Sequence, residues 1–239
     1  RFRPSPPRKV HPMSTLEVLS RRLTDLLDLT HPPVAVSFDA PTGAGASGTV
    51  AAQPAGCCFW APAQQGRLDT VAADHANCSV GSYTHGLISL EQAAGGADTA
   101  ALVGSGWVGE ADLVAAAALP FRPSSITYQP LTEAQDPEVV LVNLAPTGLM
   151  TLLGAIPELA LARKPQCVIV PLAQAGQVAV SPGCAVSRTR TNLPDDEMTC
   201  AIPARDLESV VERLEASTAA DRAVSEFAAA DMAQNFAPV

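Results

Sequence analysis

The chain has 239 residues, of which 47% are hydrophobic and 16% are charged. This composition is typical of a compact globular protein, and a chain of this length buries enough apolar surface to fold without disulfide crosslinks. The formal net charge of −9 repels phosphates and anionic lipid headgroups, so the composition argues against a nucleic acid or a membrane surface as a partner. No apolar run reaches the roughly 20 residues that a bilayer-spanning helix needs.

Residues 1–13 are basic and rich in proline, which predicts a flexible N-terminal arm, with Met13 as a candidate natural start. Residues 14–239 show no later linker and are expected to form a single domain. The first residues lack the apolar core of a secretory signal, so we expect a cytoplasmic protein. In a reducing compartment the six cysteines are free, catalytic or metal-bound rather than paired in disulfides.

The first elements are clear from their periodicity. Leucines at three- and four-residue spacing predict a helix over residues 15–29, which must end at the prolines that follow His31. Val34–Phe38 then reads as a strand, and residues 40–56 are rich in the small and turn-forming residues of a loop.

Helices and strands alternate in the rest of the chain. Helical patterns cover residues 87–94, 110–119, 147–161 (interrupted by Pro157), 206–216 and 219–236. Strand patterns cover residues 125–129, 139–143, 167–172 and 198–202. These elements predict the α/β class (mixed α+β), with one mixed sheet flanked by helices.

Cysteine and histidine gather in one segment, between Gly56 and Gly86, which holds Cys57, Cys58, His75, Cys78 and His85. These two residue types serve both as metal ligands and as nucleophile or base, so the segment is the first candidate for a functional site. Neighbouring cysteines rarely bind the same ion. One of the first pair is therefore expected to point away from the site.

A second cysteine segment, residues 181–190, contains Cys184 in a loop rich in glycine, proline and serine. Three thiolates from Cys58, Cys78 and Cys184 would suit an iron–sulfur cluster, or a zinc ion with one open position. The chain has no Cys-x-x-Cys pair, so spacing alone does not establish a metal site. Cys167 and Cys200 precede apolar residues and are interpreted as packed strand residues.

Polar residues around the cysteines suggest further roles. His75 would be a ligand, an acid or base, a donor to a cluster sulfur, or a core residue, and His85 a second catalytic candidate or a helix-entry residue. Arg188 is a candidate for binding a substrate carboxylate or phosphate, with Asp195, Asp196 and Glu197 as competing salt-bridge partners. Trp60 and Asn77, beside the cysteines, are further substrate-binding candidates.

Three motifs together resemble a known family. They are Cys-Phe-Trp-x-x-Ala-x-x-Gly from Cys58 to Gly66, His-x-Asn-Cys-x-x-Gly from His75 to Gly81, and Gly-Cys-x-x-Ser-Arg from Gly183 to Arg188. Their order and separation resemble the domain of unknown function 169 family from about Leu16 to Leu214. The resemblance implies a shared fold and a cysteine-centred metal or iron–sulfur site at Cys58, Cys78 and Cys184. Cys57 is an extra cysteine in the first motif.

Three hypotheses follow. The first is a cytoplasmic iron–sulfur enzyme, a lyase or oxidoreductase with a cluster such as 4Fe–4S, that acts on a small molecule at the open iron position. The second is a metal-free enzyme with Cys58 or Cys78 as nucleophile and His75 as base. The third is a non-catalytic protein that binds haem or a corrinoid, or senses redox state. The substrate, the identity of the metal and the assembly of identical subunits stay open.

Overall fold

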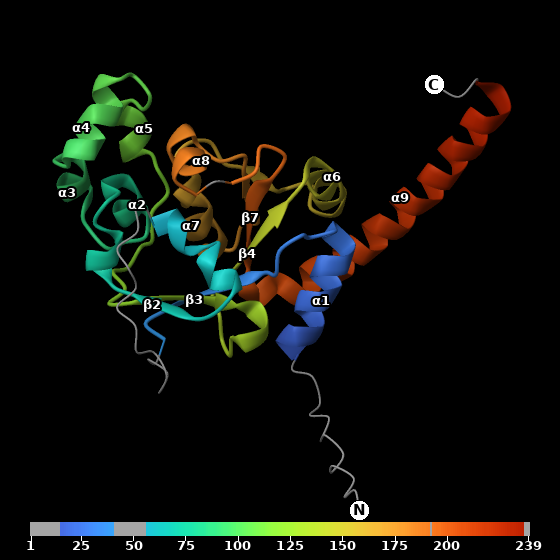
Figure 1. Ribbon diagram of the computed structural model, residues 1–239, viewed down its shortest axis with the longest axis horizontal. Coiled ribbons are helices and arrows are strands. Elements are labelled where there is room, and N and C mark those ends of the chain that lie inside the picture. Colours follow the sequence, from blue (N-terminus) through green and yellow to red (C-terminus); the bar gives the residue numbers. More distant parts are fainter. Residues whose placement is uncertain (1–14, 41–55, 192, 237–239) are drawn as a thin grey trace, which may run out of the picture.

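A seven-stranded mixed β-sheet forms the centre of the molecule (Figure 1). The computed structural model describes residues 15–40, 56–191 and 193–236. Across the sheet the strand order is β2 (Leu68–Thr70), β3 (Ile126–Pro130), β1 (Val34–Phe38), β4 (Val139–Leu144), β7 (Met198–Pro203), β6 (Ala179–Ser181) and β5 (Ala160–Leu161). Neighbours are antiparallel, except for the parallel pair β5 and β6. The predicted class, a single α/β domain with a mixed sheet flanked by helices, is confirmed.

Three helices cover one face of the sheet: α1 (Thr15–Leu27), α6 (Pro146–Ala155) and α9 (Leu207–Asn235). We call this the aliphatic face, because its core consists of leucine, valine and isoleucine from these helices and from alternate positions of β4 and β7. Gly148 lets α6 approach α1 closely, since a Cβ atom there would lie 3.1 Å from the Leu27 carbonyl oxygen.

The opposite face, called the cysteine face below, is covered by shorter elements. They are η1 (Gly56–Phe59), η5 (Gln166–Val168), α7 (Ile169–Gln174) and α8 (Ala185–Thr191), with α7 packed directly on β7 and β6. A lobe of short helices adjoins them at one end of the molecule (Figure 1): α2 (Ser79–Thr84), α3 (Leu90–Ala94), α4 (Ala97–Gly104) and α5 (Glu110–Val114). Single-turn helices complete the fold: η2 (Pro62–Gln64), η3 (Ala72–His75), η4 (Leu131–Glu133) and η6 (Ala204–Asp206).

Most of the elements with strong periodicity were predicted correctly. The first helix and the strands at 34–38, 125–129, 139–143 and 198–202 are confirmed to within about two residues. The helices predicted over 87–94, 110–119 and 147–161 are present but shorter, and the last ends at Ala155, before Pro157. The two C-terminal helices form one continuous helix, α9, whose final turns extend away from the rest of the protein (Figure 1).

One strand prediction was wrong. Residues 167–172 form the end of η5 and the start of α7 instead of a strand. A short, wholly apolar run has no periodicity that distinguishes a buried strand from a buried helix. The predicted N-terminal arm and nearly all of the loop predicted over 40–56 lie outside the described residues. Within the described part of the chain, no helix is long and apolar enough to cross a membrane.

Candidate functional site: a cysteine-lined cavity

Four cysteines from four separate segments line one small cavity on the cysteine face. Cys57 comes from η1, Cys78 precedes α2, Cys167 lies in η5, and Cys184 precedes α8. The rest of the wall is mainly apolar, formed by Gly56, Val80, Gly81, Leu102, Trp107, Pro165, Gln166, Val186 and Ser187. The cavity is small, with a volume of about 30 Å³.

Cys78 and Cys184 have the same local geometry, because each precedes a short helix. The Sγ atom of Cys78 accepts the Gly81 N–H at 3.4 Å, and that of Cys184 accepts the Ser187 N–H at 3.3 Å. Hydrogen bonds of this kind stabilise negative charge on sulfur, whether on a free thiolate or on a metal-bound one. The two turns therefore place one backbone N–H donor at each of two sulfurs of the cavity.

Without a cation, however, the cavity favours protonated thiols. Burial raises the pKa of Cys78 and Cys167. The hydrogen bond with the Cys58 thiol, followed by burial, raises the pKa of Cys57 well above its usual range. Several thiolates would repel one another in this apolar site. They would ionise together only if a positively charged group, such as a metal centre, bound among them.

The cavity changes the predicted ligand set in two respects. Cys78 and Cys184 line it as expected, but Cys57 takes the place of Cys58, whose Sγ atom lies 3.6 Å from the Arg190 carbonyl oxygen. Cys167, interpreted from the sequence as a packed strand residue, is a fourth cysteine of the cavity. Cys200 does lie in the core, on the aliphatic face. No sequence signal linked Cys167 to the site, because its role depends on where η5 packs.

The predicted metal ligands can be compared with the positions of the side chains. Among the described residues, no group of three or more cysteine, histidine, aspartate or glutamate side chains is arranged to hold a metal ion. The predicted convergence of three thiols on one ion is therefore not found in this conformation, although four thiols do face the same cavity.

The two predicted catalytic histidines are fully buried beside the cavity, not in its wall. The Nε2 atom of His75 pairs with the Thr70 hydroxyl at 2.9 Å, and Nδ1 of His85 lies 2.9 Å from the Gly81 carbonyl oxygen. Burial lowers the pKa of His75 to about 3, with a further contribution from His85, and burial lowers the pKa of His85 to about 4. Both rings are therefore neutral at physiological pH, and their catalytic role stays a prediction.

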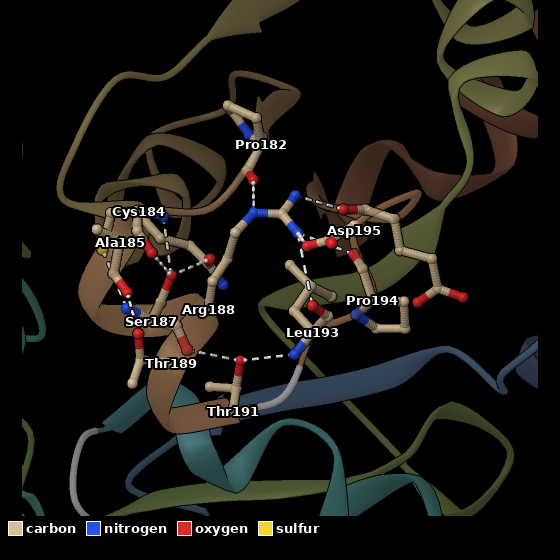
Figure 2. Close-up of polar contacts among 12 residues, drawn as sticks. Pro182, Cys184, Ala185, Ser187, Arg188, Thr189, Thr191, Leu193, Pro194 and Asp195 are labelled. Carbon is tan, nitrogen blue, oxygen red and sulfur yellow. Dashed lines mark hydrogen bonds and ion pairs between the residues drawn. The ribbon is translucent and has the colours of Figure 1, made fainter.

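Figure 2 shows that Arg188 holds together the loop between α8 and β7. Its guanidinium donates to the carbonyl oxygens of Pro182, Pro194 and Glu197 at 2.8 Å each, and it lies 3.8 Å from an Asp195 carboxylate oxygen. This geometry favours the structural alternative over substrate binding. Arg190 likewise contacts the protein, with its guanidinium 3.4 Å from the Asn77 carbonyl oxygen.

The fold and the cavity define an α/β protein with a cysteine-lined cavity on one face of its sheet. A family model for domain of unknown function 169, described as uncharacterised ArCR, matches residues 22–213. The chain belongs to this family, as its motifs suggested. Comparisons with curated proteins and with solved structures gave no significant match.

Proposed function

We propose that the chain binds an iron–sulfur cluster in the cysteine-lined cavity and acts there on a small molecule. The observation that supports this most is the convergence of four thiols, from segments far apart in sequence, on one otherwise apolar cavity. Single buried cysteines are common, because the thiol packs as a small hydrophobic group. Packing alone gives no reason for four of them to line the same cavity.

The cavity offers the donor type that an iron–sulfur cluster takes, because cysteine thiolates are the usual ligands of such clusters. In a 4Fe–4S cluster each cysteine binds a different iron, so the sulfurs stand farther apart than they do around one zinc ion. A cluster with one iron free of protein ligands supplies a Lewis acid or a redox partner.

Within this proposal, Cys57, Cys78 and Cys184 are the ligands, and Cys167 lies beside the remaining position. The N–H donors of Gly81 and Ser187 favour the charged sulfurs of Cys78 and Cys184. Leu102 and Trp107 add apolar wall around the site.

The test is purification of the full chain under argon, followed by iron, acid-labile sulfide and visible absorption measurements. We expect a coloured protein that loses most of its iron when Cys57, Cys78 or Cys184 is replaced by serine. Cys200→Ser is the control, because this buried thiol lies on the aliphatic face, away from the cavity. A colourless, iron-free wild-type protein, or equal iron in the cavity variants and the control, would overturn the proposal.

A fourth variant, Cys167→Ser, separates two kinds of cluster protein. Retained iron indicates three protein ligands and an open position, as an enzyme that binds its substrate at iron requires. Lost iron indicates a fully ligated cluster, which favours electron transfer and contradicts the small-molecule part of the proposal.

The metal-free nucleophile has less support in the structure. His75 would have to accept the proton of Cys58 or Cys78, but its Nε2 atom is paired with Thr70 and its buried Nδ1 atom has no hydrogen-bond partner. A nucleophile without an adjacent base, and with a pKa raised by burial as for Cys78, is poorly activated at neutral pH.

A further inference from the structure

A second, more polar cavity adjoins the cysteine-lined one. The two share Cys57 and Gln166 as lining residues. The second cavity is larger, with about 180 Å³ open to the centre of a water-sized sphere, and its other lining residues are His31, Trp60, Ala61, Gln64, Asn143, Thr191, Leu193, Pro194 and Thr199. A molecule bound in it would therefore lie next to the proposed cluster ligand Cys57.

The floor of this cavity interrupts the apolar pattern of the sheet. Along β4, the positions that face the cysteine side are Val139, Leu141 and then Asn143. Asn143 is paired in register with Thr199 of β7, which is paired in turn with Ser181 of β6. Three adjacent strands thus carry polar residues where hydrophobic residues would pack more favourably, which is expected where a sheet serves a binding site.

These paired residues, Asn143, Thr199 and Ser181, are called the polar row below, and hydrogen bonds connect the row to the cysteine-lined cavity. The Ser187 hydroxyl donates to Oε1 of Gln166 at 2.7 Å, and Nε2 of Gln166 lies 3.5 Å from the Thr199 hydroxyl. That hydroxyl donates to Oδ1 of Asn143 at 3.2 Å. Because Oδ1 is the acceptor, the amide nitrogen of Asn143 is left to donate to a molecule in the cavity.

The lining residues also restrict the charge of the ligand. Among the described residues that line this cavity there is no aspartate, glutamate, lysine or arginine, and the histidine among them, His31, is exposed. A carboxylate or phosphate would lose hydration without gaining an ion pair with a buried cation. Trp60 and Leu193 add apolar surface beside the polar floor.

We propose that this cavity binds a small uncharged carbonyl compound whose oxygen accepts hydrogen bonds from the Asn143 amide. Because the cavity lies beside Cys57, it would be the substrate pocket of the proposed iron–sulfur site. This catalytic role of the cavity rests on the proposed function. The binding itself depends on Asn143 and Thr199, and it can be measured whether or not a cluster is present.

The test uses acetamide as a neutral carbonyl probe and acetate as a charged probe of similar size, with ligand-detected saturation-transfer NMR on the purified full chain. We expect a transfer signal for acetamide and a much weaker one for acetate. Asn143→Ala should weaken acetamide binding about fivefold, because it removes one hydrogen bond. Asn235→Ala, an amide removed from the exposed end of α9, is the matched control and should have no effect.

Thr199→Val provides a second variant of nearly the same shape, which removes the contact that orients Asn143, and it should also weaken acetamide binding. Equal signals for the two probes, or acetamide signals unchanged in both pocket variants, would overturn the proposal. Iron and sulfide analysis of the same samples distinguishes the two proposals. Acetamide binding by an iron-free chain contradicts only the cluster, whereas an iron-containing chain without selective acetamide binding contradicts only the pocket.

Discussion

The two faces of the sheet differ in chemistry although the same strands form both. On the aliphatic face, β4 and β7 present Val140, Val142 and Ile202 to α1, α6 and α9, and the one cysteine, Cys200, is surrounded by hydrocarbon. The cysteine face carries four thiols around one cavity and a polar row around a second. We therefore expect the aliphatic face to contribute mainly to stability, and the binding chemistry that we propose lies on the cysteine face.

Several of the buried polar atoms that have no hydrogen-bond partner among the described residues lie near the cysteine face: Nε1 of Trp60, Nδ1 of His75, Nε2 of His85 and the Tyr128 hydroxyl. These rings pack near Phe59, which stacks on Tyr128 with ring centroids 5.8 Å apart. Burial raises the pKa of the Tyr128 hydroxyl, which keeps it protonated. Such unpaired groups lower stability, which is common near functional sites.

The largest expected effect tests the aliphatic face as the source of stability. Leu23 of α1 is fully buried there. Leu23→Ala should reduce the free energy of unfolding by about 3 kcal/mol, because it loses buried methyl groups and leaves a cavity. Urea denaturation measures the change, and Val224→Ala, on the exposed part of α9, is the control. A loss below about 1 kcal/mol would mean that this face does not dominate stability.

On the cysteine face, each of the two buried histidines should have a smaller effect than this, and the effect should appear in acid. Their folded pKa values, about 3 for His75 and about 4 for His85, lie below the usual 6.5. Below pH 6.5 the unfolded chain therefore binds protons that the folded chain does not, so stability is full above this pH and falls as pH drops toward 4. Each histidine should cost about 2 kcal/mol at pH 5.

Urea denaturation at pH 7.5 and pH 5 measures this loss. His85→Gln should remove about half of it, because glutamine does not titrate. His31→Gln changes an exposed histidine and serves as the control. If His85→Gln leaves the difference between the two pH values unchanged, the ring is not held neutral by burial.

The sequence predicted the aliphatic face better than the cysteine face. Regular spacing of Leu19, Leu23 and Leu27 directly encodes a buried helix face, and β1 has the bounds that its apolar pattern indicated. The short elements near the cysteines, such as α2, α8 and β6, have too few residues for a period to emerge. Their positions depend on tertiary packing and on caps such as Cys78.

The candidate site was predicted in part for the same reason. Local motifs identified Cys78 and Cys184, and the structure adds that each precedes a short helix whose N–H its sulfur accepts. They did not decide between Cys57 and Cys58. In a strand, alternation would have shown which neighbour faces the cavity, but the two cysteines lie in the 3₁₀ helix η1, where Cys57 faces it. Asn143 was read only as the end of a buried strand. Its importance depends on the register that places it opposite Thr199.

The smallest expected effect concerns the polar row itself. A double variant, Asn143→Leu with Thr199→Val, removes both partners of one hydrogen bond and leaves apolar groups in their place. Such a replacement is nearly neutral or stabilising, so we expect unfolding free energy within about 1 kcal/mol of the wild-type value. Urea denaturation checks this expectation. A loss as large as that of Leu23→Ala would show that the polar row is needed for folding. A stable double variant would instead mean that folding does not require these polar residues. Their presence on an otherwise apolar sheet face would then agree with the proposed role in binding.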